Sequence, residues 1–446
     1  MEESVKPTNK NIRTAQLSVF LIVFFSNDTT LFGTNMNQAF VALGFKLEAI
    51  IMLGIVAVYT VNHGYLISLN KRMAVIWSIF VLGVLATSCI NQDFRGGYVT
   101  LILMAAVGAF TTKCISLIAF SRAYVNVFKF FAICSILGRV ITDVVPSLRY
   151  VGLHVQRSTG QVFYHYILYA RSIEQIGGNR NYGIFREPGV FQAYLIIAII
   201  ICIILFDKRN YKKEIIGIAV LVLATMMTKS TTAYIELILV WLFFSIKGNR
   251  HAKGKEKTVI LVTEMVVVTL LICYLCMYSF GAGPSIVKRV FLDKFDSSSE
   301  SYASGFTRMA SIGANIRLWL KNPLFGVGIT NKSQAYNDLV YSLYGNSVDS
   351  DTNTVLATFS QFGCLVGMII VVGVFGLTCI IGNRRKERLI ALIMVLVLLS
   401  TEYFLFSALF NVWLWYGLRN GIGKRKCGDT EETSYEYLDK RLLHIV

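Results

Sequence analysis

Long, uninterrupted apolar runs dominate the sequence. Clear examples, each long enough to cross a hydrocarbon layer as a helix, are Met73–Ile90, Val190–Phe206, Thr258–Phe280 and Val355–Ile381. A backbone in lipid must satisfy its own hydrogen bonds, so runs of this length predict helices, and the alternation typical of a membrane barrel is missing. We therefore predict an all-α polytopic integral membrane protein, with residues 1–446 forming a single membrane domain.

The pattern predicts about twelve membrane helices. Ten of them lie near residues 15–33, 46–67, 73–91, 97–120, 123–145, 189–206, 213–228, 230–246, 258–280 and 355–382. The last apolar run, Leu389–Leu418, has a polar break at Ser400-Thr401-Glu402-Tyr403 and basic residues at both ends. It predicts a hairpin of two short helices. The alternative, one long tilted helix, would place the basic segment Lys424-Arg425-Lys426 on the external side.

Composition agrees with this fold class. The chain is 55% hydrophobic and 15% charged, whereas a soluble domain is nearer one quarter charged. The first apolar run, Leu17–Phe32, is followed by no small-residue cleavage site, so we expect it to be a membrane anchor. Cys273 and Cys276 form a CxxC inside an apolar run without nearby histidine or acidic partners, which favours packing. We expect no disulfide framework, no zinc site and no cofactor.

The net charge of +17 follows the predicted topology. Basic residues gather in every second short connection and at both chain ends, while the intervening short connections hold one or none. That asymmetry follows the positive-inside rule and predicts that both termini are cytoplasmic. The charge therefore does not point to a nucleic-acid partner. The basic clusters are Lys71-Arg72, Lys208-Arg209 with Lys212-Lys213, Lys247 to Lys257, Arg384 to Arg388, and Lys424 to Lys426.

Two long connections, about 146–188 and 281–354, fall on the external side, and a cytoplasmic tail covers about 419–446. Long loops in a compact protein are usually functional. The first connection has no lysine, two acids (Glu174 and Glu187) and five arginines, which are Arg149, Arg157, Arg171, Arg180 and Arg186. The planar arginine fork suits phosphate oxygens, so this connection predicts a phosphate or pyrophosphate ligand. Lipid headgroup contacts or surface salt bridges are the alternative.

Glu187 and Pro188 stand where the next apolar helix should begin. Proline fits the first turn of a helix, and a carboxylate is stabilised near the positive helix end. Glu187 is therefore either an ordinary cap or a functional carboxylate beside Arg180 and Arg186.

The second long connection carries three further signals. Arg308 and Arg317 are nine residues apart and need not share a helical face, and Gly326 and Gly328 predict a tight turn or close backbone approach. Aromatic and aliphatic residues at helical spacing over Gln334–Tyr344 predict an amphipathic interfacial helix or, alternatively, an aromatic platform for sugar rings. The DxD in Asp349-Ser350-Asp351-Thr352-Asn353 suits a divalent metal, and an ordinary polar loop or helix cap is the simpler interpretation.

The order of these motifs resembles the O-antigen ligase and polymerase superfamily of bacterial membrane glycosyltransferases. The resemblance rests on Arg180-x-x-Gly-x-Phe-x-Glu-Pro, Arg308, Asn322-Pro-Leu-Phe-Gly-Val-Gly, and Asp349–Asn353 with Gly363 beyond. The ligase branch is expected to carry a His-Asn pair where this chain has Asp351-Thr352-Asn353. The Glu-Pro pair is more typical of polymerases of surface and exopolysaccharide repeat units. Both departures favour a polymerase.

What the resemblance implies is a substrate and a set of roles. The substrate would be an oligosaccharide repeat unit on undecaprenyl diphosphate, met at the outer face of the bacterial cytoplasmic (inner) membrane. Arg180 and Arg308 would clamp the diphosphate, with Arg186 and Arg317 as further diphosphate ligands, because positioned cations stabilise charge that grows on a leaving group. Glu187 or Asp351 would deprotonate the acceptor hydroxyl. A metal is not needed, and a chain-length regulator and a flippase are the expected protein partners.

Two other functions fit part of the pattern. A ligase-type glycosyltransferase of the same superfamily is one. The other is a secondary transporter or flippase of lipid-linked oligosaccharide, which would explain charged residues inside predicted helices. These are Asp28, Glu236, and Arg139 with Asp143, which are four apart and can pair on one face. Transport sites sit near the bilayer midplane, however, so a transporter does not predict two large polar external connections.

Overall fold

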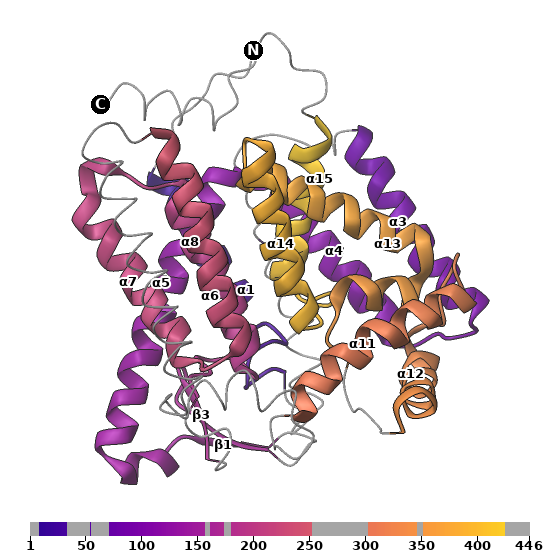
Figure 1. Cartoon of the computed structure of the whole chain (residues 1–446), viewed down its shortest axis with the longest axis horizontal. Helices are drawn as coiled ribbons and strands as arrows, with labels where there is room; N and C mark the ends of the chain where they lie inside the picture. The colour runs from indigo at the N-terminus through magenta and orange to yellow at the C-terminus, as the bar shows by residue number, and fades with distance from the viewer. Residues whose placement is uncertain are drawn as a thin grey trace, which may run out of the picture.

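A computed structural model of the chain describes residues 9–33, 71–156, 161–173, 180–251, 302–345 and 351–423, together with Gly54. This part of the chain is mostly helical, with one small sheet (Figure 1). The predicted helices 46–67 and 258–280, the CxxC at Cys273 and Cys276, and the end of the tail beyond 423 lie outside the described residues.

The described helices follow the apolar runs closely. They are α1 (Asn9–Phe24), α3 (Lys71–Ile90), α4 (Gly96–Cys114), α5 (Leu117–Val144), α6 (Pro188–Ile204), α7 (Tyr211–Met227), α8 (Thr231–His251), α11 (Tyr302–Lys321), α12 (Ile329–Tyr344), α13 (Thr354–Ile381), α14 (Arg385–Thr401) and α15 (Ala408–Gly423). Two short 3-10 turns cover Pro146–Tyr150 and Lys208–Asn210. Most predicted helix bounds are therefore confirmed to within a few residues.

Four of the described helices, α3, α4, α5 and α13, are long and apolar enough to cross a membrane, and α6 is a shorter apolar helix. Their outward faces carry large apolar side chains: Leu82 of α3 is 65% exposed and Phe375 of α13 is 54% exposed. Polar side chains such as Thr111 and Ser135 are fully buried. An apolar exterior around a polar interior suits lipid as the solvent. The count of twelve spans and the cytoplasmic termini stay predictions.

Helix α15 lies at the centre of one half of the bundle, between α4 and α13. Small residues allow the close approach, because a Cβ on Gly376 of α13 would lie 2.0 Å from the carbonyl oxygen of Gly417. On the other side, a Cβ on Gly108 of α4 would lie 2.4 Å from the Trp415 ring. Glycine contacts of this kind are how membrane helices pack without a hydrophobic driving force between them.

The predicted break in the last apolar run is confirmed, with a difference in packing. Helix α14 ends at Thr401 and α15 begins at Ala408, so the polar segment around Glu402 forms the connection. The two helices do not pair as a simple hairpin, since α14 packs against both α13 and α8 and α15 packs against α13 and α4. The connection between them is thereby held against the start of α13.

The first predicted helix, 15–33, ends earlier than expected, at Phe24. The residues that follow form a buried turn, in which the backbone N–H and the hydroxyl of Thr30 both donate to the Ile184 carbonyl at 2.8 and 2.7 Å. Asp28 therefore lies in this turn and not inside a helix, and it is 2% exposed. The turn joins the chain start to the segment just before α6.

The first long connection holds a small antiparallel sheet that the all-α prediction did not include. Strands β1 (Leu153–Gln156), β2 (Val162–His165) and β3 (Ala170–Ser172) pair in that order. Val155 and Phe163 pack with Tyr182 in a separate apolar cluster. The alternation is only three or four residues long in each strand, too short to register beside twenty-residue apolar runs.

Helices α11 and α12 occupy the second long connection and lie toward the same lower edge of Figure 1 as the sheet. The amphipathic helix predicted over Gln334–Tyr344 is confirmed as the main part of α12. Its buried face, with Tyr336 and Val340, packs against residues of α11 at helical spacing, which are Phe306, Ala310, Ala314 and Leu318. Tyr336 thus serves packing, whereas Tyr341 is 65% exposed, so the sugar-platform alternative stays open for the exposed tyrosines alone.

Candidate functional site

The segment that carries the first arginine motif is wedged between α5 and the α7–α8 connection. Arg180 Nε donates to the Thr228 carbonyl at 3.0 Å, and the Asn181 N–H donates to the Met227 carbonyl at 2.9 Å. Gly183 has a φ of +57°, and a Cβ there would lie 2.9 Å from the Phe191 ring. Only glycine fits both the backbone angle and the space, so the motif glycine fixes the path of the chain from Arg180 to α6.

Glu187 occupies the residue before α6, in extended backbone, and Pro188 opens the helix. The Glu187 side chain makes no capping hydrogen bond to the α6 backbone. Glu187 is thus the N-cap residue of α6 by position but not through a side-chain bond, and its carboxylate interacts with Arg186, Arg308 and Glu402.

A second carboxylate, Glu402, meets the start of α6 from the α14–α15 connection. A Cβ on Gly189 would lie 2.2 Å from Glu402 Oε1, so the glycine makes the space in which this carboxylate sits. The main chain that follows is fixed, since Thr354 Oγ1 donates to the Glu402 carbonyl at 2.6 Å and accepts from the Phe404 N–H at 2.9 Å. Glu402 is 8% exposed.

Arg180, Arg186, Glu187, Arg308 and Glu402 interact electrostatically, and we name them the arginine–glutamate cluster. Burial raises the pKa of Glu402 well above its usual range; Glu187 adds to the rise, while Arg186 and Arg308 oppose it. Burial lowers the pKa of Arg308, and the neighbouring Arg180 acts in the same direction against Glu402 and Glu187. Three segments far apart in the sequence thus bring two arginines close together beside two glutamates.

Arg186 is held differently from the other two arginines of the cluster. Its N–H donates to the Asp28 carbonyl at 2.9 Å, and its guanidinium lies 4.0 Å from Asp28 Oδ1. The other Asp28 oxygen accepts from Tyr194 at 2.5 Å, and Tyr194 also contacts Ser407 Oγ at 2.8 Å. Burial alone would lower the pKa of Arg186, but the charges of Asp28, Glu187 and Glu402 raise it. Arg186 is therefore a cation that Asp28 holds in place through both its carboxylate and its carbonyl.

Arg317, the fourth arginine predicted to bind diphosphate, lies apart from the cluster. It is exposed on α11, and no interaction with a described residue of the cluster involves it. Nine residues at 3.6 per turn place Arg308 and Arg317 on opposite sides of one helix. The prediction that Arg317 binds the same ligand is therefore not supported by its position.

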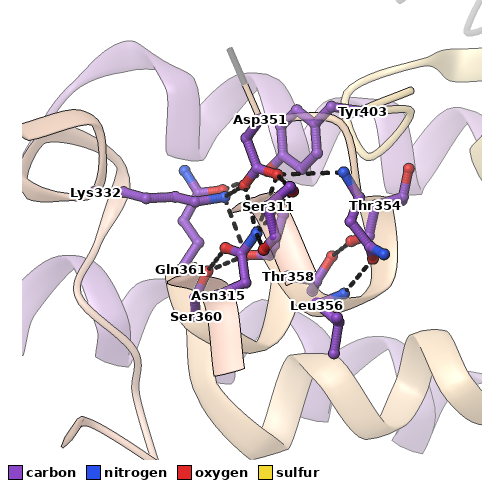
Figure 2. A network of polar contacts seen from close by, with 12 residues as sticks. Ser311, Asn315, Lys332, Asp351, Thr354, Leu356, Thr358, Ser360, Gln361 and Tyr403 are labelled. Carbon is purple, nitrogen blue, oxygen red and sulfur yellow. Dashed lines mark hydrogen bonds and ion pairs between the residues drawn. The ribbon is translucent and has the colours of Figure 1, made fainter. Parts of the chain in front are cut away.

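Asp351, the second predicted base, lies in a separate polar network shown in Figure 2. Lys332 Nζ of α12 is 2.6 Å from Asp351 Oδ2. Asn315 Nδ2 of α11 donates to both carboxylate oxygens at 3.0 Å, and Ser311 Oγ donates at 2.5 Å. The Asn353 N–H adds a bond of 3.2 Å. We name these five residues the Asp351 network.

The Asp351 network is closed on itself. Asn315 is fully buried, and its Oδ1 accepts from Ser360 of α13 at 2.6 Å. Lys332 Nζ also lies 5.0 Å from the centre of the Tyr403 ring. Burial lowers the pKa of Lys332, and Asp351 opposes that shift. Every oxygen of Asp351 is engaged, and the network links α11, α12 and α13; the role of Asp351 as a base stays a prediction. Asp349 of the DxD lies outside the described residues.

The Asn322–Gly328 segment docks on a kink in α13. Gly363 has a φ of +73° inside that helix, and a Cβ there would lie 2.2 Å from the Leu324 carbonyl oxygen. A Cβ on Gly326 would in turn meet the Gln361 backbone at 2.4 Å. The Val327 N–H donates to the Ser360 carbonyl at 2.9 Å. The predicted close backbone approach is confirmed, and the motif is a brace for α13.

Asp143, at the end of α5, is surrounded by Arg139 of the same helix and by two arginines of the first connection. Arg139 Nε lies 2.6 Å from Asp143, as the four-residue spacing predicted, while Arg171 and Arg149 lie at 2.8 and 3.6 Å. Arg139 also donates to the Arg180 carbonyl at 3.4 Å. Arg149 and Arg171 are thus used in salt bridges, which is the alternative interpretation of this connection. Arg157 lies outside the described residues.

An apolar cavity lies behind the arginine–glutamate cluster, among α6, α13, α14 and α15. Tyr194 and Phe404, which flank the cluster, line one end of it, and Leu205 and Ile381, at the far ends of their helices, line the other. Its remaining lining residues are almost all aliphatic, such as Ile197 and Leu398. The cavity therefore runs along the helices from the charged cluster.

Comparison with known proteins assigns no family. No protein-family model matches the chain, and no curated protein matches it. The resemblance to the O-antigen ligase and polymerase superfamily therefore stays a prediction based on short motifs.

Sequence reasoning placed Arg180, Arg186, Glu187 and Arg308 in one site, and these four do meet. It did not include Glu402, which was only the polar break in an apolar run. The sequence did carry a signal for Glu402, because an acidic residue within an apolar run of this length is costly to bury and often marks a functional site. Asp28 carried the same signal, and its contact with Arg186 needs the tertiary structure.

Proposed function

We propose that this protein is a membrane glycosyltransferase that joins oligosaccharide repeat units, carried on undecaprenyl diphosphate, into a polysaccharide at the outer face of the bacterial cytoplasmic membrane. One observation carries the proposal: Arg180 and Arg308 approach each other beside Glu187 and Glu402, at the end of an apolar cavity. The three arginines of the cluster outnumber its two glutamates, and the resulting positive charge favours an anionic ligand.

The chemistry of the transfer fits these residues. The bond between the anomeric carbon and the diphosphate breaks, so negative charge grows on the leaving group. Arg180 and Arg308 would stabilise that charge where it develops, which typically contributes about 10²–10³-fold in rate for each donor. Arg186, held by Asp28, would add a fixed positive field. A carboxylate of the cluster would take the proton of the acceptor hydroxyl.

The apolar cavity supports a lipid-linked substrate. A diphosphate at Arg180 and Arg308 would sit beside Tyr194 and Phe404, at the mouth of the cavity. The aliphatic lining along α6 and α14 then offers a path for an isoprenoid chain within the bundle. A ligand with an anionic head and a long apolar tail matches both parts, as lipid-linked sugars do.

The two alternatives receive less support. A ligase of the same superfamily would be expected to use a histidine at the position of Asp351, where this chain has a carboxylate paired with Lys332. A transporter would place its polar site at mid-depth, whereas the arginine–glutamate cluster lies at the ends of α6 and α14.

The test is complementation of cells that lack the gene, with surface polysaccharide length as the readout. Arg180→Lys and Arg308→Lys keep the charge but remove the planar fork, so we expect at least a hundredfold loss of long polymer. Arg317→Lys is the matched control, because Arg317 lies on the far side of the same helix as Arg308. Normal polymer from the two cluster variants at normal expression would contradict the proposal, and the transporter alternative would then lead.

A further inference from the structure

Glu402 is the one carboxylate of the cluster that neither motif nor resemblance assigned. It reaches the start of α6 only because residue 189 is a glycine, whose missing Cβ would lie 2.2 Å from Oε1. Thr354 fixes the main chain from the carbonyl of Glu402 to the N–H of Phe404 through its hydroxyl. The carboxylate is thus built into a position beside Glu187 and is not a chance neighbour.

We propose that Glu187 and Glu402 act as a carboxylate pair that holds one proton at rest and accepts the proton of the acceptor sugar hydroxyl during transfer. This inference rests on the proposed function and deepens it by assigning the base. Two close carboxylates in a buried site do not both ionise easily, as in other enzymes that use such pairs. Burial raises the pKa of Glu402 well above its usual range, and the charge of Glu187 acts in the same direction.

The step balances without any further reagent. The ionised member of the pair takes the proton from the acceptor O–H, and that oxygen forms a bond to the anomeric carbon of the donor sugar. The bond from the anomeric carbon to the diphosphate oxygen breaks, and undecaprenyl diphosphate leaves with the electron pair. The pair then carries two protons and returns one to solvent before the next cycle.

The other described carboxylates nearby are occupied. Asp351 is bound by Lys332 and by Asn315 through both of its oxygens. Asp28 is 2% exposed, accepts from Tyr194 and sits behind Arg186. A proton on either of them would compete with these bonds. Glu187 and Glu402 also have charged partners, but those partners are Arg186 and Arg308, where the diphosphate would bind.

The pair makes a specific prediction about pH. The charged groups that act on Glu402 are Glu187 before α6, Arg186, Arg308 on α11, and Asp28 in the turn after α1. Replacing either glutamate by glutamine removes one negative neighbour, so the pKa of the remaining carboxylate falls. Each single variant keeps some activity, reduced about tenfold, and works at lower pH than wild type. The double variant has no base, and we expect a loss of about 10²–10⁴-fold.

The experiment uses the full-length protein in lipid nanodiscs and the lipid-linked oligosaccharide extracted from cells that lack the gene. Polymer formation is followed on gels from pH 5 to pH 9 for wild type, Glu187→Gln, Glu402→Gln and the double variant. Binding of undecaprenyl diphosphate is measured in parallel. Glu236→Gln is the matched control, since Glu236 is a fully buried carboxylate of α8 outside the cluster.

The outcomes separate the two proposals. Activity of the single variants that extends to lower pH, with carrier binding kept, supports the pair. Wild-type-like rates and pH profiles in both variants overturn the pair and leave the proposed function standing. Loss of carrier binding together with activity also overturns it, because Glu402 would then only position the arginines. Wild type that neither binds undecaprenyl diphosphate nor makes polymer refutes the proposed function itself.

Discussion

The arginine–glutamate cluster and the Asp351 network are built from the same kinds of side chain, and they solve the problem of buried charge in opposite ways. In the Asp351 network one cation meets one carboxylate at 2.6 Å, and the amide and hydroxyl groups of Asn315 and Ser311 complete the shell. In the cluster, Arg308 interacts with Arg180 as well as with Glu402 and Glu187, and Glu402 interacts with Glu187 as well as with Arg186 and Arg308. Like charges are brought together there beside opposite ones.

The difference separates structure from function. A closed polar network rigidifies the fold and leaves nothing for a ligand to contact. Paired like charges are unfavourable until a partner arrives, and groups with strongly perturbed pKa values gather at functional sites for that reason. The Asp351 network therefore supports α11, which carries Arg308, while the cluster is where a substrate would bind. The predictions below test this division.

Breaking the Asp351 network should have the largest effect on stability. Lys332→Met or Asp351→Asn each leaves the partner buried without its opposite charge, which typically costs about 3–5 kcal/mol. The double variant should be less destabilised than either single change. Thermal unfolding in detergent measures both effects.

The same variants test the role of Asp351 in the reaction. Because every oxygen of Asp351 is engaged, the polymer made per molecule of folded Asp351→Asn protein should stay within about threefold of wild type at permissive temperature. A stable Asp351→Asn protein with no polymer would mean that the network, and not the cluster, holds the base.

The sequence predicted the helices well and the site in part, for physical reasons. An apolar run of about twenty residues predicts a helix without information from the rest of the chain, so α3, α6 and α13 match their predicted bounds closely. The turn after Phe24 was missed although its segment Ser26–Thr30 is polar, because the hydrogen bonds that hold it go to Ile184. No local pattern can reveal such a long-range partner.

The assignment of site residues shows the same limit. Arg180, Arg186, Glu187 and Arg308 stood out because charged residues beside apolar runs are few. Asp351 stood out equally, yet its partner Lys332 is far away in the chain and only the fold pairs them. Sequence can therefore nominate charged residues, but it cannot decide which of them already have a partner.

Acid should destabilise the small sheet β1–β3 before it destabilises α11 and α12. His165 of β2 is 5% exposed, burial lowers its pKa to about 4, and its Nδ1 accepts from the Ile167 N–H at 3.1 Å. A depressed pKa means that the stability is present above pH 6.5 and lost as pH falls toward 4. The full loss is about 3 kcal/mol, and it falls on the connection that holds Arg180.

The measurement is thermal unfolding between pH 7 and pH 4, compared with His165→Asn, which keeps an acceptor but cannot be charged. The variant should lose less stability over this range. Hydrogen exchange should report opening of β1–β3 before α11 and α12. Simultaneous opening of β1–β3 and of α11 with α12 would contradict this order of opening.

Filling the space at Gly189 should disturb the cluster alone. Alanine places a Cβ 2.2 Å from Glu402 Oε1, so the carboxylate has to move, while α6 itself should gain from a better helix former. We expect about a tenfold loss of polymer, with little change in unfolding temperature. Gly96→Ala is the matched control, because a Cβ at that first residue of α4 meets nothing within 4 Å. Equal activity of the two variants would contradict the position assigned to Glu402.

The smallest effect that we expect is the contribution of Glu402 to the pH dependence of the protein's stability. Its pKa is raised in the folded protein by burial and by Glu187, so the folded state holds a proton that the unfolded chain releases near its ordinary value of about 4.3. Stability from this group is therefore present at low pH and is lost as pH rises toward the folded pKa. Glu402→Gln removes that dependence, so its unfolding temperature relative to wild type should increase from pH 5 to pH 8. Gly96→Ala should lack such a trend relative to wild type, because it changes no titratable group and its Cβ meets nothing within 4 Å. A falling difference for Glu402→Gln would mean that Glu402 is ionised in the folded protein and stabilised by Arg186 and Arg308, and the cluster would then resemble the closed network instead of contrasting with it.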